Sequence, residues 1–171
     1  MPVKNLFCSI LLLMSVAASA QTTESINAAL PDSIRVGASE KWLCSLEANG
    51  SQIYQCVKKG TEWVWEHKGP EADLTLNGKK VGKHYAGPTW EYSDGSKVGG
   101  NVLKSSPAKD PTRDVPLFLI KGNGMDGKGK FCYVTKIQRV NTKGGVKPTT
   151  KPDASNEGKI VWVPYTATYH F

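Results

Sequence analysis

The sequence predicts a single antiparallel all-β domain, a barrel or a sandwich, over residues 41–171. Short stretches that alternate apolar and polar residues recur here, separated by Gly, Pro, Asn and Asp at intervals of roughly 8–12 residues. No helical apolar stripe of useful length follows residue 40. About ten short strands of this kind are typical of a sandwich or a closed barrel. A barrel is favoured because the long aromatic C-terminal strand needs a partner to protect its edge.

The first twenty residues have the pattern of an export signal. Lys4 supplies a positive start, residues 6–16 are apolar, and Ala18-Ser19-Ala20 gives a small-x-small cleavage pattern. The apolar run is too short to span a bilayer as a helix. We therefore expect a signal peptide at residues 1–20, a secreted or periplasmic protein, and no membrane span.

The elements expected after the signal follow from local patterns. Residues 21–40 are small and polar, which predicts a flexible lead-in with a short helix near residues 25–30. Three hairpins are predicted from dipeptides that favour tight turns: 41–47 with 52–58 through Asn49-Gly50, 74–76 with 80–85 through Asn77-Gly78, and 89–92 with 96–103 through Asp94-Gly95. The other predicted strands are 61–67, 115–120, 131–140 and 159–171, the last broken at Pro164, with a loop over 143–158.

The charge pattern bears on the class of partner. The formal net charge is +7, from 22 Lys and Arg against 15 Asp and Glu. The lysines are dispersed and the arginines are few, whereas nucleic-acid binders cluster such residues on one face. We therefore expect a basic but soluble surface and no nucleic-acid partner.

Three cysteines, Cys44, Cys56 and Cys132, follow the predicted signal. An oxidising compartment would allow one disulfide and one free thiol. A three-residue turn at 49–51 would place Cys44 opposite Cys56 within disulfide range, whereas a two-residue turn would put them on opposite faces. We predict a Cys44–Cys56 disulfide, with Cys56–Cys132 as the alternative if those strands are neighbours.

The candidate site is the stretch His-Tyr-Ala-Gly-Pro-Thr-Trp-Glu at residues 84–91, which gathers four functional side chains around a Gly-Pro bend. Arg139 lies on an otherwise mostly apolar face of its strand, so its guanidinium needs a carboxylate or must leave the barrel. Glu91 is the candidate partner. We expect a ligand-binding pocket at the barrel mouth, formed by His84, Tyr85, Trp90, Glu91, Arg139 and Asn141.

Each of these groups also has a purely structural explanation. A histidine in a strand is more often packed than reactive, an Arg–Glu pair can hold two strands together, and aromatic residues fill small β cores without any ligand. Aromatic rings beside hydrogen-bonding groups nevertheless suit a glycan or a small amphipathic ligand. We therefore expect a binding or cell-envelope module, with a secreted structural protein that has no small ligand as one alternative.

The other alternative is an extracellular hydrolase-like enzyme that uses His84 and Glu91 as an acid/base pair. A dehydrogenase is rejected, because no helix follows the GxGxxG match at residues 122–127 to bind a pyrophosphate. Ser96 lacks the glycine spacing of a nucleophile elbow. The three histidines lack the local spacing of a metal site, so we expect neither a metal nor a cofactor.

Several motifs occur in one characteristic order: Ile53-Tyr54-Gln55-Cys56, residues 70–74, residues 84–91, Asp94-Gly95-Ser96, residues 137–145 and residues 163–169. Over roughly residues 40–171 the chain resembles the exported bacterial and fungal family catalogued as domain of unknown function 3455. The resemblance implies no activity, substrate or catalytic residue. Where the family tends to have Cys-Asp after its Gly-Gly loop, this chain has Pro152-Asp153, so a disulfide from that loop to Cys56 cannot form.

Overall fold

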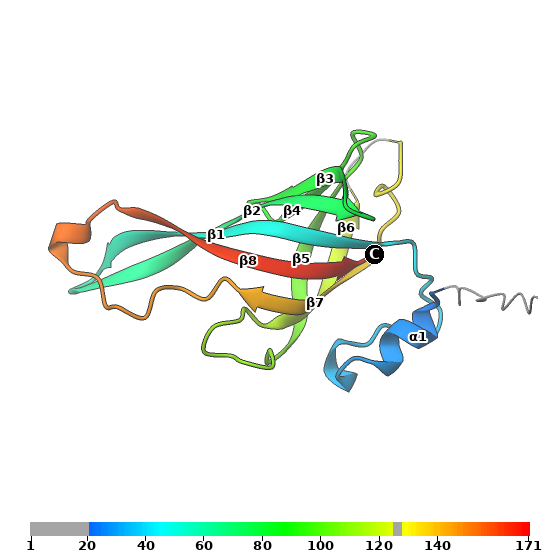
Figure 1. Cartoon of the computed structure of the whole chain (residues 1–171), viewed down its shortest axis with the longest axis horizontal. Helices are drawn as coiled ribbons and strands as arrows, with labels where there is room; N and C mark the ends of the chain where they lie inside the picture. Colours follow the sequence, from blue (N-terminus) through cyan, green and yellow to red (C-terminus); the bar gives the residue numbers. More distant parts are fainter. Residues whose placement is uncertain (1–20, 125–127) are drawn as a thin grey trace, which may run out of the picture.

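The computed structural model describes residues 21–124 and 128–171. They form a closed barrel of eight antiparallel strands, in which each strand pairs with the next and the last pairs with the first (Figure 1). The strands are β1 (Ser45–Lys59), β2 (Glu62–Leu76), β3 (Lys79–Tyr85), β4 (Thr89–Tyr92), β5 (Lys97–Ser106), β6 (Leu117–Gly124), β7 (Lys136–Gly144) and β8 (Ile160–His170). The predicted antiparallel all-β fold is confirmed, in its barrel form.

There are fewer strands than the predicted ten because two pairs of predicted strands are continuous. The predicted strands 41–47 and 52–58 fall in the single long strand β1, which begins at Ser45. The predicted strands 61–67 and 74–76 fall in β2, which begins at Glu62. The hairpins at Asn77-Gly78 and Asp94-Gly95 are confirmed, since they connect β2 to β3 and β4 to β5. Pro164 does not break β8, where it stands opposite Ser51 of β1.

The hairpin predicted at Asn49-Gly50 is wrong. β1 passes straight through this dipeptide, and Gly50 stands opposite Ala72 of β2. The chain turns instead at Gly60, whose φ of +63° is in the left-handed region. A Cβ on Gly50 would lie 2.1 Å from the carbonyl oxygen of Glu71. Glycine is therefore required here for the close approach of two strands and not for a turn.

The predicted Cys44–Cys56 disulfide is also wrong, as is its Cys56–Cys132 alternative, because all three thiols are free. Cys44 precedes β1 and Cys56 lies near its far end. Extended backbone rises about 3.3 Å per residue, so the two cysteines are tens of ångströms apart. Cys56 Sγ lies instead 3.9 Å from the carbonyl oxygen of Asp153.

The strands β1, β2 and β8 continue past the barrel as a three-stranded ribbon, visible at the left of Figure 1. The segment between β7 and β8 contains the short 3₁₀ helix η2 (Ala154–Asn156) and lies along this ribbon. Trp65 Nε1 donates to the carbonyl oxygen of Thr150 at 3.0 Å. The predicted loop at residues 143–158 is thus anchored to the ribbon.

Inside the barrel, side chains of alternate residues fill the interior. The end at which β8 terminates, here called the closed end, is filled by aromatic rings. Phe131 stacks on Phe171 with ring centroids 4.4 Å apart, and Tyr92 meets Phe131 edge-on at 5.4 Å. The opposite end, here called the mouth, contains the turn between β3 and β4 and the start of the ribbon.

The N-terminal segment predicted to be flexible is folded on the outside of the barrel. It contains α1 (Thr23–Ala28) and the 3₁₀ helix η1 (Asp32–Ile34). Ile34 is fully buried in a small outer cluster with Leu119 of β6 and Val140 of β7. This apolar contact holds the segment against the barrel wall.

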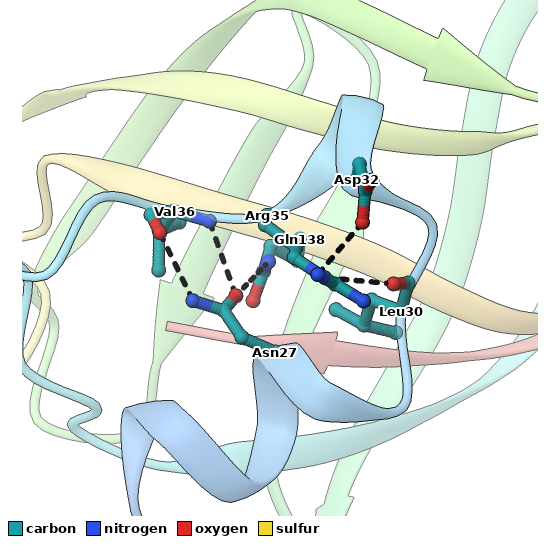
Figure 2. Close-up of polar contacts among 6 residues, drawn as sticks. All are labelled: Asn27, Leu30, Asp32, Arg35, Val36 and Gln138. Atoms are coloured by element: carbon teal, nitrogen blue, oxygen red, sulfur yellow. Dashed lines mark hydrogen bonds and ion pairs between the residues drawn. The ribbon is translucent and has the colours of Figure 1, made fainter.

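Hydrogen bonds complete the attachment of this segment (Figure 2). The Asn27 side chain donates to the carbonyl oxygen of Val36 at 2.9 Å and accepts from its N–H at 3.1 Å. Gln138 Nε2 of β7 donates to the Ile34 carbonyl oxygen at 2.7 Å. Buried backbone groups outside the sheet are thereby satisfied.

The predicted signal peptide at residues 1–20 and the end of the GxGxxG match at residues 125–127 lie outside the described residues. Gly122 and Gly124, at its beginning, belong to the end of β6. Within the described parts of the chain, no helix is both long enough and apolar enough to cross a membrane.

Candidate functional site

The first two members of the site are brought together by the pairing of β3 with β4. His84 stands directly opposite Trp90 in this pair. Both side chains are buried, and the imidazole stacks on the indole with ring centroids 4.2 Å apart and planes 8° from parallel. Tyr169 of β8 meets both rings edge-on, at 5.2 Å and 5.3 Å. These three rings form the floor of the barrel mouth.

Tyr85 and Glu91 lie outside this floor, because each follows an inward residue in its strand and side chains alternate across a sheet. The Tyr85 hydroxyl donates to Glu91 Oε2 at 2.9 Å. Lys97 and Lys83 reach the same oxygen at 3.4 Å and 3.6 Å. The Tyr85 hydrogen bond, assisted by both lysines, lowers the pKa of the Glu91 carboxyl. The predicted Glu91–Arg139 pair is therefore wrong.

Arg139 lies inside the barrel on β7, and only 8% of its surface is exposed. Its Nε and Nη2 atoms donate to the carbonyl oxygen of Pro116 at 3.1 Å and 2.8 Å. Its guanidinium carbon lies 4.0 Å from the centre of the Phe118 ring. Among the described residues, no carboxylate oxygen lies within 4.0 Å of this guanidinium. The positive charge is thus held by a neutral carbonyl and an aromatic face.

A pocket of about 330 Å³ opens in the barrel mouth beside these groups. His84, Trp90 and Arg139 line it, while Tyr85, Glu91 and Asn141 do not. Asn141, which follows the inward part of β7 in a left-handed conformation, donates to Thr168 Oγ1 at 3.2 Å. The other lining residues are Gln52, His67, Lys68, Gly69, Pro70, Gly87, Pro88, Val102, Phe118, Ile120 and Tyr169.

Gln52 and His67 are polar pocket residues that the sequence analysis missed. His67 Nε2 and Gln52 Oε1 lie 2.6 Å apart, a hydrogen bond in which the imidazole donates. The His67 ring also contacts the Tyr54 ring, at a centroid distance of 5.2 Å. Once β1 is known to be continuous, alternation from Leu46 places Gln52 on the inner face. The misplaced turn at Asn49-Gly50 concealed this signal.

Three buried polar atoms of pocket-lining residues have no hydrogen-bond partner among the described residues: Gln52 Nε2, Trp90 Nε1 and the Tyr169 hydroxyl. A buried polar group without a partner costs about 1–3 kcal/mol. The first two can only donate, and a tyrosine hydroxyl can donate as well. Residues that line the pocket therefore contain several buried donors without partners.

The histidines of the pocket are neutral near pH 7. His84 Nδ1 donates to the carbonyl oxygen of Thr89 at 2.9 Å, which leaves Nε2 as the acceptor. Burial lowers the pKa of His84 to about 3, and the nearby charge of Arg139 acts in the same direction. Burial and the Arg139 charge also lower the pKa of His67. Arg139 is consequently the positive centre deep in the pocket.

The described residues contain no group of three or more His, Cys, Asp and Glu side chains that could hold a metal ion. The model of a family described as protein of unknown function (DUF3455) matches residues 37–171. No curated protein and no solved structure matches the chain significantly.

Proposed function

The chain belongs to the DUF3455 family, and we propose that it is an exported binding module whose barrel mouth takes up a small amphipathic ligand. The observation that carries this proposal is the mixed wall of the mouth pocket. Val102, Phe118 and Ile120 contribute apolar surface, while Arg139 and Gln52 contribute buried donors. Concave, mostly apolar sites with a few convergent polar groups are typical of small-molecule binding.

An amphipathic ligand is favoured over a glycan by the way in which Trp90 is covered. Sugars stack on exposed aromatic faces, but one face of the Trp90 indole is covered by His84 and its edges meet Tyr169 and Phe171. The Phe118 ring is likewise engaged by Arg139. Within the pocket, aromatic rings thus contribute packed wall and not open platforms.

The geometry does not favour the alternative of a hydrolase-like enzyme, because His84 and Glu91 do not form an acid/base pair. His84 points into the barrel and Glu91 points out of it, so the two groups cannot act on one substrate atom. No carboxylate lines the pocket. A binding role requires only the shape and the polarity of the mouth pocket described above.

Binding can be tested with octanol, a neutral amphipath, by following the indole N–H resonance of Trp90 in ¹⁵N-labelled protein. We expect a saturable shift of that resonance. Val102 lines the pocket and is 51% exposed, so Val102→Trp should block the shift. Leu103→Trp is the matched control, because Leu103 is 46% exposed and does not line the pocket. Absence of any saturable shift in the unaltered protein, with octanol or with the simple sugars tested beside it, would favour a purely structural role.

Export is the second part of the proposal and rests on the N-terminal pattern of Lys4, the apolar run and Ala18-Ser19-Ala20. N-terminal sequencing of protein recovered outside the cytoplasm is expected to begin at Gln21. A product that keeps Met1 and stays with the cells would contradict it.

A further inference from the structure

The polarity of the mouth pocket specifies its ligand more narrowly, and this inference rests on the proposed binding function. We infer that the ligand is a monocarboxylate, bound through its carboxylate by Arg139 and Gln52, with its apolar part against Phe118 and Ile120. The inference has three supports: a buried charge without a counter-ion, unpartnered donors in a lining that contains no carboxylate, and the size of the pocket.

The first support is the buried charge of Arg139. An ionised side chain taken out of water is costly unless an opposite charge accompanies it. Arg139 is only 8% exposed, yet its neighbours in the described chain are all neutral: the Pro116 carbonyl, the Phe118 ring and the Tyr169 hydroxyl. A guanidinium binds a carboxylate through two N–H groups in one plane, and the hydrogen bonds to Pro116 use only one N–H each of Nε and Nη2. A ligand carboxylate would neutralise this charge.

The second support is the imbalance of hydrogen-bonding groups. His67 holds Gln52 by its amide oxygen, and the amide nitrogen of Gln52 is left without a partner. Trp90 Nε1 and the Tyr169 hydroxyl are further unused groups in the same wall. No Asp or Glu lines the pocket. Such a wall favours acceptor atoms, and the unpaired guanidinium repels a cation.

The third support is size and total charge. A volume of about 330 Å³ is near the lower limit of ordinary small-molecule pockets, and it holds roughly ten non-hydrogen atoms at about 30 Å³ each. Lys68, the other cation in the lining, is paired with Glu66. A dianionic phosphate would therefore bring two charges to one unpaired guanidinium, whereas a carboxylate brings one. The apolar wall of Val102, Phe118 and Ile120 requires an apolar remainder in the ligand. A monocarboxylate with a chain of about eight carbon atoms fits the volume of the pocket and supplies the apolar remainder.

The test compares three probes of equal chain length, octanoate, octanol and octylamine, by titration calorimetry at neutral pH. We expect octanoate to bind at least tenfold more tightly than octanol, because a charge-assisted hydrogen bond is stronger than a neutral one. Octylamine should bind more weakly than octanol. Octanol binding with no preference for octanoate would overturn this inference and leave the binding function standing. No binding of any probe would overturn both.

Variants assign the preference to particular residues. Gln52→Glu places a carboxylate in the pocket, so octanoate should lose its tenfold advantage while octanol still binds. Gln55→Glu is the matched control, because Gln55 lies on the opposite face of the same strand and does not line the pocket. Arg139→Met should also remove the preference, with octanol binding as the check that the pocket is intact. A Gln52→Glu or Arg139→Met protein that keeps the full preference would contradict the assignment.

Discussion

The two ends of the barrel interior are built from the same alternating strands but are filled differently. At the closed end, Phe131, Phe171 and Tyr92 pack against one another, and neighbouring Leu46 and Leu74 are fully buried. At the mouth, the inward positions include a glutamine, two histidines and an arginine beside apolar and aromatic residues. Trp90 lies between the two, in contact with His84 on one side and Phe171 on the other.

This difference indicates a division of tasks within one barrel. Apolar packing at the closed end stabilises the fold, because it removes aromatic surface from water without leaving polar atoms unpaired. The mouth keeps unused donors and a buried charge, which are costly in the free protein. Substitutions at the closed end should therefore act on stability, and substitutions at the mouth chiefly on binding.

The largest expected effect is that of Phe131→Ala at the closed end. Phe131 is fully buried and stacked on Phe171, so its truncation should lower the free energy of unfolding by about 3–5 kcal/mol. Urea unfolding measures this. Tyr133→Ala is the control, since Tyr133 is 86% exposed and should change little. Equal losses in the two variants would show that the aromatic cluster has no special role.

A substitution at Gly50, where β1 runs from the closed end to the mouth, should lower the stability nearly as much. Gly50→Ala would bring a Cβ to 2.1 Å from a backbone oxygen of β2, and overpacking of this kind costs about 1–3 kcal/mol or more. Gly37→Ala offers a matched control, because the nearest neighbour of its Cβ, Ser39 Oγ, would be 4.0 Å away. A Gly50→Ala protein as stable as Gly37→Ala would mean that β1 and β2 separate without cost.

His84, which lies at the boundary between the two ends, should make the stability of the fold sensitive to acid. The pKa of His84 is about 3 in the folded state, below the ordinary value of 6.5 expected after unfolding. Between these values the unfolded chain binds a proton that the folded chain does not. The contribution of His84 to stability is therefore complete above pH 6.5 and falls by up to about 1.4 kcal/mol per pH unit as the pH is lowered toward 3.

Urea unfolding at a series of pH values measures this dependence. His84→Gln should flatten the pH profile. His67 and His170, whose pKa values are also lowered by burial, would account for part of the remaining slope. Carboxyl groups whose pKa values are lowered by hydrogen bonds, such as Glu91 and Asp94, would account for the rest. An unchanged slope in His84→Gln would contradict the assignment to His84.

At the mouth, Phe118→Ala should affect binding more than stability. Phe118 is half-buried and lies under the Arg139 guanidinium, so we expect a loss of about 1–2 kcal/mol in unfolding free energy. Octanol and octanoate binding should both weaken, because the apolar wall is shortened. Leu117→Ala is the paired control, since Leu117 packs against the outer cluster around Ile34 and should leave binding unchanged.

The smallest effect is expected outside the barrel. Glu91→Gln should leave both the thermal midpoint and octanoate binding unchanged at physiological salt, because Glu91 meets only Tyr85 and solvent-exposed lysines. Thermal unfolding and the same titration check this. A loss of binding in Glu91→Gln would place the ligand on the outer face.

The sequence by itself determined the class of fold, the family and two of the turns. Alternation and turn spacing are local signals. The dipeptides Asn77-Gly78 and Asp94-Gly95 also act locally, because left-handed conformations at Asn77, Gly78 and Gly95 form the turns. The 84–91 stretch also contained four of the residues that line the pocket, two of which, His84 and Trp90, were predicted as site residues. Trp90 and Glu91 are consecutive in the sequence, so in a strand their side chains must point to opposite faces of the sheet. This local signal already argued against placing Glu91 inside the barrel with Arg139.

Tertiary structure decided the rest. Asn49-Gly50 has the chemistry of a turn, but barrel closure brings β2 so close to Gly50 that glycine is needed within the strand. That continuity separates Cys44 from Cys56 and brings Gln52 into the mouth. The partner of Arg139 is a backbone carbonyl on the segment leading into β6, and no side-chain pattern encodes it. Contacts between residues distant in sequence depend on how the strands close, which local propensities do not contain.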